Sequence, residues 1–110
     1  MTETPFEGLA SLDRQIHEPA RLAVMAALSA CEHADFLYLQ QITGLTKGNL
    51  SSHLSKLENA GFIRIDKTFV KKTPRTRARL TDEGRRAMDE YWRIFDGARR
   101  GAVQWRSDGK

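Results

Sequence analysis

The sequence predicts an α+β fold in which helices precede and follow a basic β-hairpin. Three observations carry this prediction. Residues 37–61 contain two short segments of helical apolar spacing, joined by a turn at Gly44. Residues 62–80 are rich in β-favouring side chains and hold seven basic residues against one acidic. Residues 81–100 return to a helical pattern, which Thr81 is expected to cap. A helix-turn-helix followed by a hairpin is a winged helix, an arrangement typical of proteins that bind duplex DNA.

Local signals specify the turn between the two short helices. Gly44 stands where the first helix is expected to stop, because glycine adopts the left-handed conformation at little cost. Thr46 is expected to cap the second helix, since its hydroxyl can accept a bond from a free backbone N–H. This second helix covers residues 47–60, and three leucines at helical spacing predict its buried stripe: Leu50, Leu54 and Leu57.

The opposite face of residues 47–60 is small and polar, which suits a helix that reads a DNA groove. Asn can bond the edge of adenine, Ser can serve either kind of base, and a helix N-terminus favours phosphate. A merely solvated face usually carries Glu–Lys pairs at i, i+4, and none occurs here. We expect base contacts from Asn49, Ser51, Ser52, His53 and Lys56. Phosphate contacts are expected from Thr46 and Lys47, where Gly48 allows close approach.

Most of the excess positive charge lies in the expected hairpin. The chain carries a formal net charge of +4, whereas residues 1–46 hold six acidic and two basic side chains. Pro74 marks the expected turn region, and period two places Arg75 and Arg77 on one face of a strand. We expect phosphate contacts from Lys71, Lys72, Arg75 and Arg77. The alternative is a charged patch that only improves solubility.

Amphipathic helices are expected at both ends of the chain. One covers about residues 6–17; a second runs from Pro19 to about residue 31, and a polar connector with Asp35 as a helix cap follows. We therefore expect one domain over residues 1–110, with a core of about 17–80 flanked by helices at about 6–17 and 81–100. The flanking helices predict a homodimer interface at Phe6, Leu9, Leu12, Ile16, Met88, Tyr91, Trp92 and Phe95. Alternatively, the two helices pack on each other within one protomer.

The chain also resembles a known group of proteins. Its motifs are similar to those of small stand-alone winged-helix regulators within the MarR-like and ArsR-like families. The resemblance spans about residues 9–98 and is carried by the runs 45–54 (LTKGNLSSHL), 56–63 (KLENAGFI), 75–76 (RT), 80–81 (LT) and 83–85 (EGR). It implies a homodimer on a pseudo-palindromic operator, with residues 47–60 in the major groove. It also implies that Lys71, Lys72 and Arg75 reach the flanking backbone or the minor groove.

Other function classes find little support. A single cysteine excludes an intramolecular disulfide and fits a reducing cytoplasm. Metal sensors of the ArsR type carry paired Cys ligands on the helix at 35–43, which has none; Cys31, Glu32, His33 and Asp35 are expected to be core and connector residues, so we expect no metal site. Ser51, Ser52 and His53 are adjacent on a helix and point in different directions, so no nucleophile–base pair forms and no enzyme is expected. No apolar run is long enough to span a membrane.

The sequence thus predicts a cytoplasmic, duplex-DNA-binding transcriptional regulator that acts as a homodimer, with repression as the expected outcome. No cofactor is expected, whereas a small-molecule effector stays open. The alternative from another class is a winged-helix adaptor that binds proteins and no DNA. The operator, the target genes and a redox role for Cys31 cannot be read from the sequence.

Overall fold

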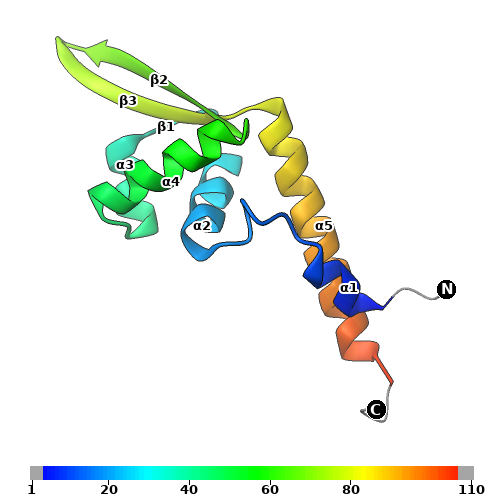
Figure 1. The fold of residues 1–110 in the computed structure, drawn as a ribbon. Helices are drawn as coiled ribbons and strands as arrows, with labels where there is room; N and C mark the ends of the chain where they lie inside the picture. Colours follow the sequence, from blue (N-terminus) through cyan, green and yellow to red (C-terminus); the bar gives the residue numbers. More distant parts are fainter. Residues whose placement is uncertain (1–3, 107–110) are drawn as a thin grey trace.

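The computed structural model describes residues 4–106, so the expected domain over 1–110 begins and ends outside the described part. The α+β prediction is confirmed: five helices accompany a small antiparallel sheet (Figure 1). In chain order the elements are α1 (Pro5–Ala10), α2 (Pro19–Ser29), β1 (Ala34–Asp35), α3 (Phe36–Thr43), α4 (Lys47–Asn59), β2 (Ile63–Val70), β3 (Thr73–Leu80) and α5 (Asp82–Gln104).

The sheet is antiparallel with strand order β1-β3-β2. β2 pairs with β3 along its whole length, from Ile63 opposite Leu80 to Val70 opposite Thr73. β1 pairs only with Ala78 and Arg77, so the outer half of the hairpin has no third strand. We call the β2–β3 hairpin, residues 63–80, the wing. Its inner end is buried, and there the core is built from residues of α2, α3, α4 and α5: Val24, Met25, Leu28, Leu39, Leu50, Leu54, Leu57 and Met88.

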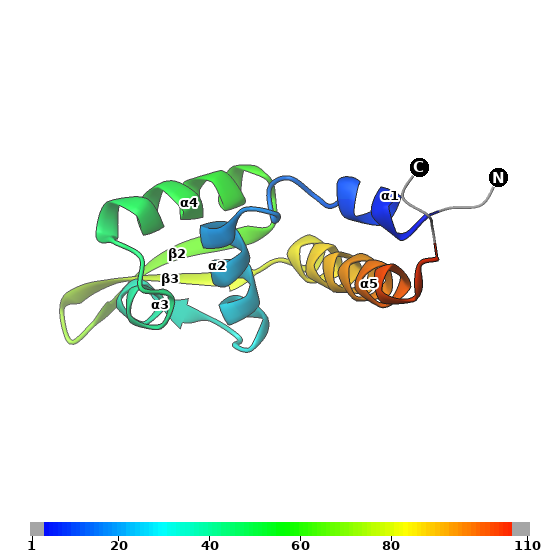
Figure 2. The same cartoon turned by 90° about the horizontal axis from the view of Figure 1, so that it is seen from below.

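Helices α1 and α5 form an arm that projects from this winged core. α1 lies along the C-terminal half of α5, away from the sheet (Figures 1 and 2). Gly8 allows the approach, because an added Cβ would lie 3.3 Å from Ile94 Cγ2. The molecule is correspondingly elongated, with extents of 64 × 25 × 21 Å. The two terminal helices therefore do pack on each other within one protomer, as the alternative to the dimer interface predicts.

The helix expected over 6–17 is shorter than predicted and ends at Ala10. Its backbone is redirected at Asp13, whose carboxylate accepts hydrogen bonds from the N–H groups of Gln15 and Ile16. Such a side-chain turn competes with helix formation. Leu12 and Ile16 therefore reach the core from a loop, although their spacing is helical.

The start of α5 is fixed against the end of α4 by backbone contacts. Thr81 caps α5, as predicted, by accepting a bond from the Gly84 N–H, and its hydroxyl donates to the Gly61 carbonyl. Gly61 has φ +83°, a conformation that favours glycine. At Gly84 an added Cβ would lie 2.0 Å from the Phe62 carbonyl oxygen, so only glycine fits. This junction therefore favours glycine at both positions.

Two local predictions around the sheet are met only in part. The turn of the wing is made by Lys71 and Lys72, which have φ of 50° and 66°, whereas Pro74 lies within β3 opposite Phe69. Proline is tolerated there because β1 does not extend to this end of β3. Asp35 does precede α3, but its side chain makes no capping bond; the connector instead forms strand β1.

Candidate nucleic-acid interface

Helix α4 presents a continuous polar face to solvent. Gly44 ends α3 with φ +72°, and the Thr46 hydroxyl accepts a bond of 3.2 Å from the Asn49 N–H, so both turn predictions are confirmed. The three leucines of the buried stripe all lie in the core. The expected DNA-contacting residues on the other side are exposed: Thr46, Lys47, Gly48, Asn49, Ser51, Ser52 and Lys56.

His53 departs from this pattern. Only 18% of its side chain is exposed, because it turns toward the start of α2. Arg21 Nη1 lies 3.3 Å from His53 Nδ1, and Glu18 Oε2 lies 3.6 Å from the same nitrogen. His53 therefore joins α4 to α2, and its expected base contact stays a prediction. The cause is a tertiary contact between positions far apart in the sequence.

Glu18 is the centre of this small cluster. Its carboxylate caps α2 by accepting from the N–H groups of Ala20 and Arg21, at 2.8 and 3.0 Å. Burial raises the pKa of the Glu18 carboxyl, but the two backbone bonds and the charges of His53 and Arg21 outweigh burial and leave it below its ordinary value. Glu18 is thus held as a carboxylate that joins the two helices.

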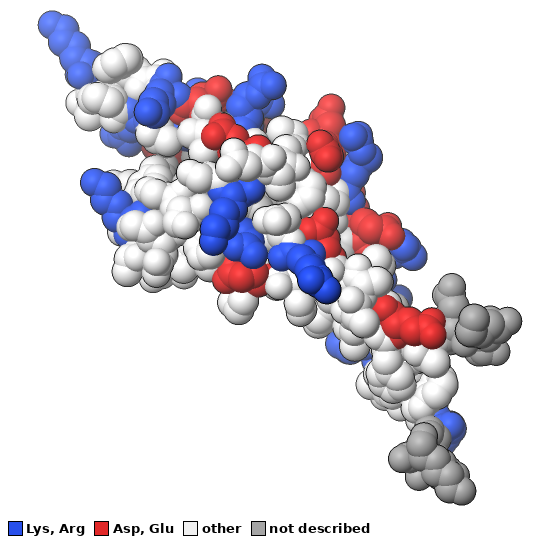
Figure 3. Space-filling view, in the orientation of Figure 1, with Lys and Arg blue, Asp and Glu red and all other residues white. Residues whose placement is uncertain are grey.

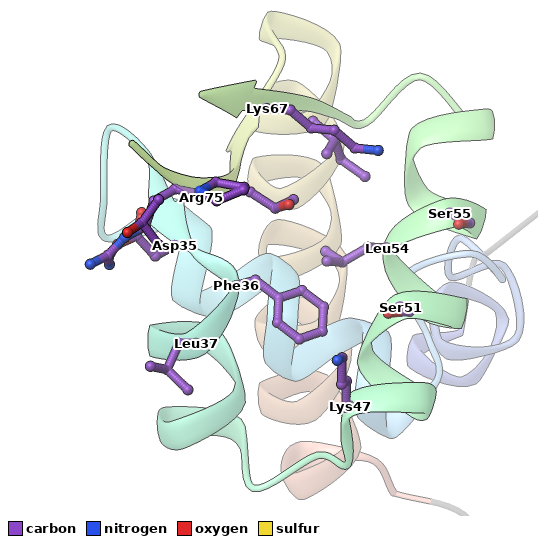
Figure 4. A pocket seen from close by; sticks show the side chains of 13 residues that line it. Asp35, Phe36, Leu37, Lys47, Ser51, Leu54, Ser55, Lys67 and Arg75 are labelled. Atoms are coloured by element: carbon purple, nitrogen blue, oxygen red, sulfur yellow. The ribbon is translucent and has the colours of Figure 1, made fainter. Parts of the chain in front are cut away.

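A groove of about 690 Å³ separates α4 from the wing. Lys47, Ser51 and Ser55 line it from α4, and Lys67, Thr73 and Thr76 from the wing, with Phe36 and Leu54 at its floor. Figure 4 shows Lys67 pointing across the groove toward α4 and Lys47 at the N-terminal end of that helix. Cations on both walls and hydroxyls between them suit the passage of a phosphate backbone.

Sequence reasoning missed Lys67 and gave no role to Ser55. A signal for Lys67 existed: it is two residues beyond Ile65 and four beyond Ile63, so period two places all three on one face of β2. Ile63 on this face is buried, and Ile65 packs against the core. The face therefore points toward α4, and Lys67 follows it past the end of the core.

The arginines of β3 lie on the other face of the wing, together as predicted but turned away from α4. Arg75 Nη1 lies 3.2 Å from Asp35 Oδ2, and Figure 4 shows Arg75 beside Asp35, on the opposite side of the groove from α4. Arg77 Nη1 donates to His33 Nε2 at 3.2 Å, and Arg77 is half-buried. Both guanidinium groups thus have partners within the protein. The expected phosphate contacts of Arg75 and Arg77 stay predictions.

The tip of the wing is strongly basic. Lys71 and Lys72 form the two-residue turn, and both are exposed. In Figure 3, Lys and Arg side chains gather at the tip of the wing, at the upper left of the view. The predicted phosphate contacts at Lys71 and Lys72 are therefore accessible to a partner. Lys67 extends the same basic surface into the groove.

The expected dimer interface divides into two sets. Leu12, Ile16, Met88 and Tyr91 are buried within the protomer, which corrects their assignment to an interface. The Tyr91 hydroxyl shares a 3.0 Å hydrogen bond with His17 Nδ1, and burial raises the pKa of Tyr91. The other four residues keep exposed surface on the arm: Phe6, Leu9, Trp92 and Phe95. Val103 and Trp105, which the prediction omitted, add exposed apolar surface there.

The connector residues weighed as metal ligands have other neighbours. His33 contacts Arg77, and Asp35 contacts Arg75. Within residues 4–106, no three His, Cys, Asp or Glu side chains come together as a metal site would require. Among the helices of the same residues, none combines the length and hydropathy needed to cross a bilayer.

Residues 20–97 match the family model of the winged helix DNA-binding domain. The match covers most of the chain, from the start of α2 through the wing into α5. The chain belongs to this family. An uncharacterized protein of Methanocaldococcus jannaschii is 38% identical over 71 residues, which cover 64% of this chain and 77% of that protein.

Solved structures of similar fold are transcriptional regulators. A transcriptional regulator homologue from Pyrococcus horikoshii OT3 is 29% identical, with a TM-score of 0.74 over 89% of this chain and 96% of that one. Sco3205 from Streptomyces coelicolor, a MarR family regulator solved in complex with DNA, has a TM-score of 0.64 at 21% identity, over 94% of this chain and 74% of that one. The chain therefore has the winged-helix fold that these regulators share.

Proposed function

We propose that the protein regulates transcription by binding duplex DNA as a homodimer, with α4 in the major groove and the wing on the adjacent backbone and minor groove. The observation that carries this proposal is the groove between α4 and the wing, whose walls hold Lys47 and Lys67. A phosphate strand fits such a groove when α4 enters the major groove beside it. Sco3205, which shares the fold, was solved in complex with DNA.

Residue roles follow from the exposed positions. Asn49, Ser52 and Lys56 lie on the outward face of α4 and are proposed to meet base edges, with Ser51 beside them. Thr46, Lys47 and the backbone at Gly48 belong to the N-terminal turn, where N–H groups favour phosphate. In the wing, Lys67, Lys71 and Lys72 are proposed to contact phosphate.

The arm supplies the proposed dimer contact. Apolar side chains on α1 and α5 remain exposed, and identical chains can cover them by a two-fold contact. Such an axis would present two α4 helices about 34 Å apart, one turn of DNA. Repression of transcription is the proposed outcome. A small-molecule effector is proposed only as a regulator acting through the arm.

The rival function is a protein-binding adaptor on the same fold. The two functions differ in their charge requirement, because phosphate contacts need the cations that line the groove whereas a protein partner does not. A mobility-shift assay with a mixed-sequence duplex at low salt separates them. We expect binding that weakens steeply as salt rises. Absence of any shift would favour the adaptor.

A paired substitution tests the groove itself. Lys67→Ala should flatten the slope of log affinity against log salt concentration by roughly 0.9, the value for one phosphate contact. Arg64→Ala is the matched control, because Arg64 lies on the same strand but on the face turned away from α4. Equal slopes for both variants and the wild-type protein would show that the groove does not contact DNA.

Recognition of the DNA sequence by Asn49 is tested on a duplex selected from a random pool. Asn49→Ala should weaken binding to the selected duplex by on the order of 1–3 kcal/mol and bind unselected DNA as before. An equal loss of affinity on both kinds of duplex would mean that Asn49 contacts the DNA backbone rather than a base.

A further inference from the structure

The outer end of the wing carries an apolar pair that no other described part of the protein covers. Phe69 lies opposite Pro74 in the β2–β3 register, and 72% of its surface is exposed. β1 pairs with β3 only at Ala78 and Arg77, so nothing in the described sheet flanks this end of the hairpin. Phe69 and Pro74 thus place apolar surface at the tip of the hairpin, where a partner can cover it.

The face on which Phe69 lies points to the partner. Strand alternation places Phe69 on the same face of β2 as Ile63, Ile65 and Lys67. This face is turned toward α4, and its inner part forms one wall of the groove. Phe69 therefore continues the groove wall outward, beyond Lys67. A DNA strand that lies in the groove would therefore also lie beside the ring of Phe69 at the end of the wing.

The surroundings of the pair are cationic. Lys71 and Lys72 follow Phe69 at the turn, and Lys67 precedes it by two residues. None of these three lysines forms an ion pair with another described residue. An apolar ring among free cations fits a partner that combines anions with apolar surface. Duplex DNA offers this combination in its minor groove, where sugar faces lie between two rows of phosphates.

We propose that Phe69, backed by Pro74, is an apolar wedge that the wing inserts into the minor groove. The ring packs against deoxyribose and opens a neighbouring base step, while Lys71 and Lys72 hold the phosphates on either side. This inference rests on the proposed DNA-binding function. It adds a source of specificity without hydrogen bonds, because pyrimidine–purine steps open more easily than others.

The wedge and the cations differ in their dependence on salt, which supplies the test. Phe69→Thr keeps a β-favouring residue and removes the ring. On a duplex selected from a random pool it should lower affinity roughly tenfold or more, as expected when a Phe is no longer buried, with an unchanged salt slope. Lys72→Ala should instead flatten the slope. Val70→Thr is the matched control, because Val70 is an exposed neighbour on the opposite face of the hairpin.

A second readout follows the base step directly. 2-Aminopurine is placed in turn at each base step along the selected duplex. Its fluorescence should rise at one step when the wild-type protein binds and should not rise there with Phe69→Thr. Wild-type affinity and brightening retained by Phe69→Thr would overturn the wedge while leaving DNA binding intact. Binding of the wild-type protein to no duplex would overturn the proposed function itself. Phe69-dependent binding to vesicles of equal phosphatidylcholine and phosphatidylglycerol, with no DNA binding, would overturn the wedge in favour of a membrane contact.

Discussion

Glu18 shows how one carboxylate connects the capping of a helix to the position of another. It caps α2 through the N–H groups of Ala20 and Arg21 and lies 3.6 Å from His53 on α4. The contact with His53 depends on where the loop after α1 delivers residue 18. α4 is therefore held at its middle by α2, on the side away from the groove.

The lowered pKa of Glu18 predicts an acid-dependent loss of stability. A carboxyl whose pKa is depressed in the folded state contributes stability above its unfolded value, ordinarily 4.5, and loses it as pH falls through the folded pKa. Glu18→Gln should lower the free energy of unfolding by about 1 kcal/mol at pH 7, a typical value for a helix cap. The difference from wild type should shrink below pH 4.5, as measured by urea unfolding. Glu32→Gln, at an exposed connector carboxylate, should show no such difference at either pH; a constant Glu18 effect at all pH values would contradict the assignment.

At this scale the sequence predicted the residues whose roles are local. Thr46 and Thr81 were predicted as caps and Gly44 as a helix stop because each acts on atoms within a few positions. The contacts that His53, Arg75 and Arg77 make within the protein were not predicted, because their partners Glu18, Asp35 and His33 come from distant segments. Lys67 was missed although its strand period contained the signal.

At the scale of elements, the wing turn carries a conflict between backbone and charge. A two-residue hairpin turn with positive φ at both positions favours Asn-Gly, but here both residues are lysine. The double change Lys71→Asn and Lys72→Gly should raise the free energy of unfolding by about 1 kcal/mol or more, because lysine in the left-handed region is strained. The same change should weaken DNA binding, and its salt slope should flatten by about 0.9 for each lysine that binds a phosphate.

The double change is therefore expected to raise stability and to lower DNA affinity, and the two effects can be measured separately. Thermal unfolding measures the first and fluorescence anisotropy with labelled duplex the second. The control is Lys71→Arg with Lys72→Arg, which keeps both charges and both backbone conformations and should change neither quantity greatly. A stabilised variant that binds DNA with wild-type affinity and slope would show that the turn lysines serve no phosphate contact.

Elements with strong local periodicity were predicted well, and those defined by pairing were not. α4 and α5 were expected near their observed bounds, since capping residues and apolar spacing agree. β1 has only two residues and exists through its pairing with β3, so no local pattern marks it. The loop after α1 mimics a helix because Leu12 and Ile16 keep helical spacing, yet Asp13 bonds its own backbone.

At the scale of the whole molecule, the arm separates two tasks. The winged core has its own buried cluster, whereas α1 and the C-terminal half of α5 extend it to 64 Å and leave apolar side chains in water. The sequence predicted apolar side chains at both ends of the chain but could not say which of them are buried in the protomer and which are exposed. Four residues of the expected interface are buried in the protomer core, whereas Phe6, Leu9, Trp92 and Phe95 keep exposed surface.

The proposed dimer is best tested at a position that the protomer does not need. Val103 on α5 is 80% exposed, so Val103→Glu should leave the melting temperature of the protomer nearly unchanged and place a charge in the proposed interface. We expect the wild-type protein to sediment at twice the 12.5 kDa chain mass, and Val103→Glu to shift toward the chain mass. Binding to a two-half-site operator should fall strongly, because one wing and one α4 then act alone, whereas binding to a single half-site should not change.

Gln104→Glu adds the same charge at the next residue, which turns about 100° around the helix, and should keep the wild-type mass and affinity. A wild-type protein that sediments as a monomer at micromolar concentration yet binds the full operator tightly would refute the dimer. Such a result would leave the winged core and its groove as they are, because Lys47, Lys67 and the exposed face of α4 all come from one chain.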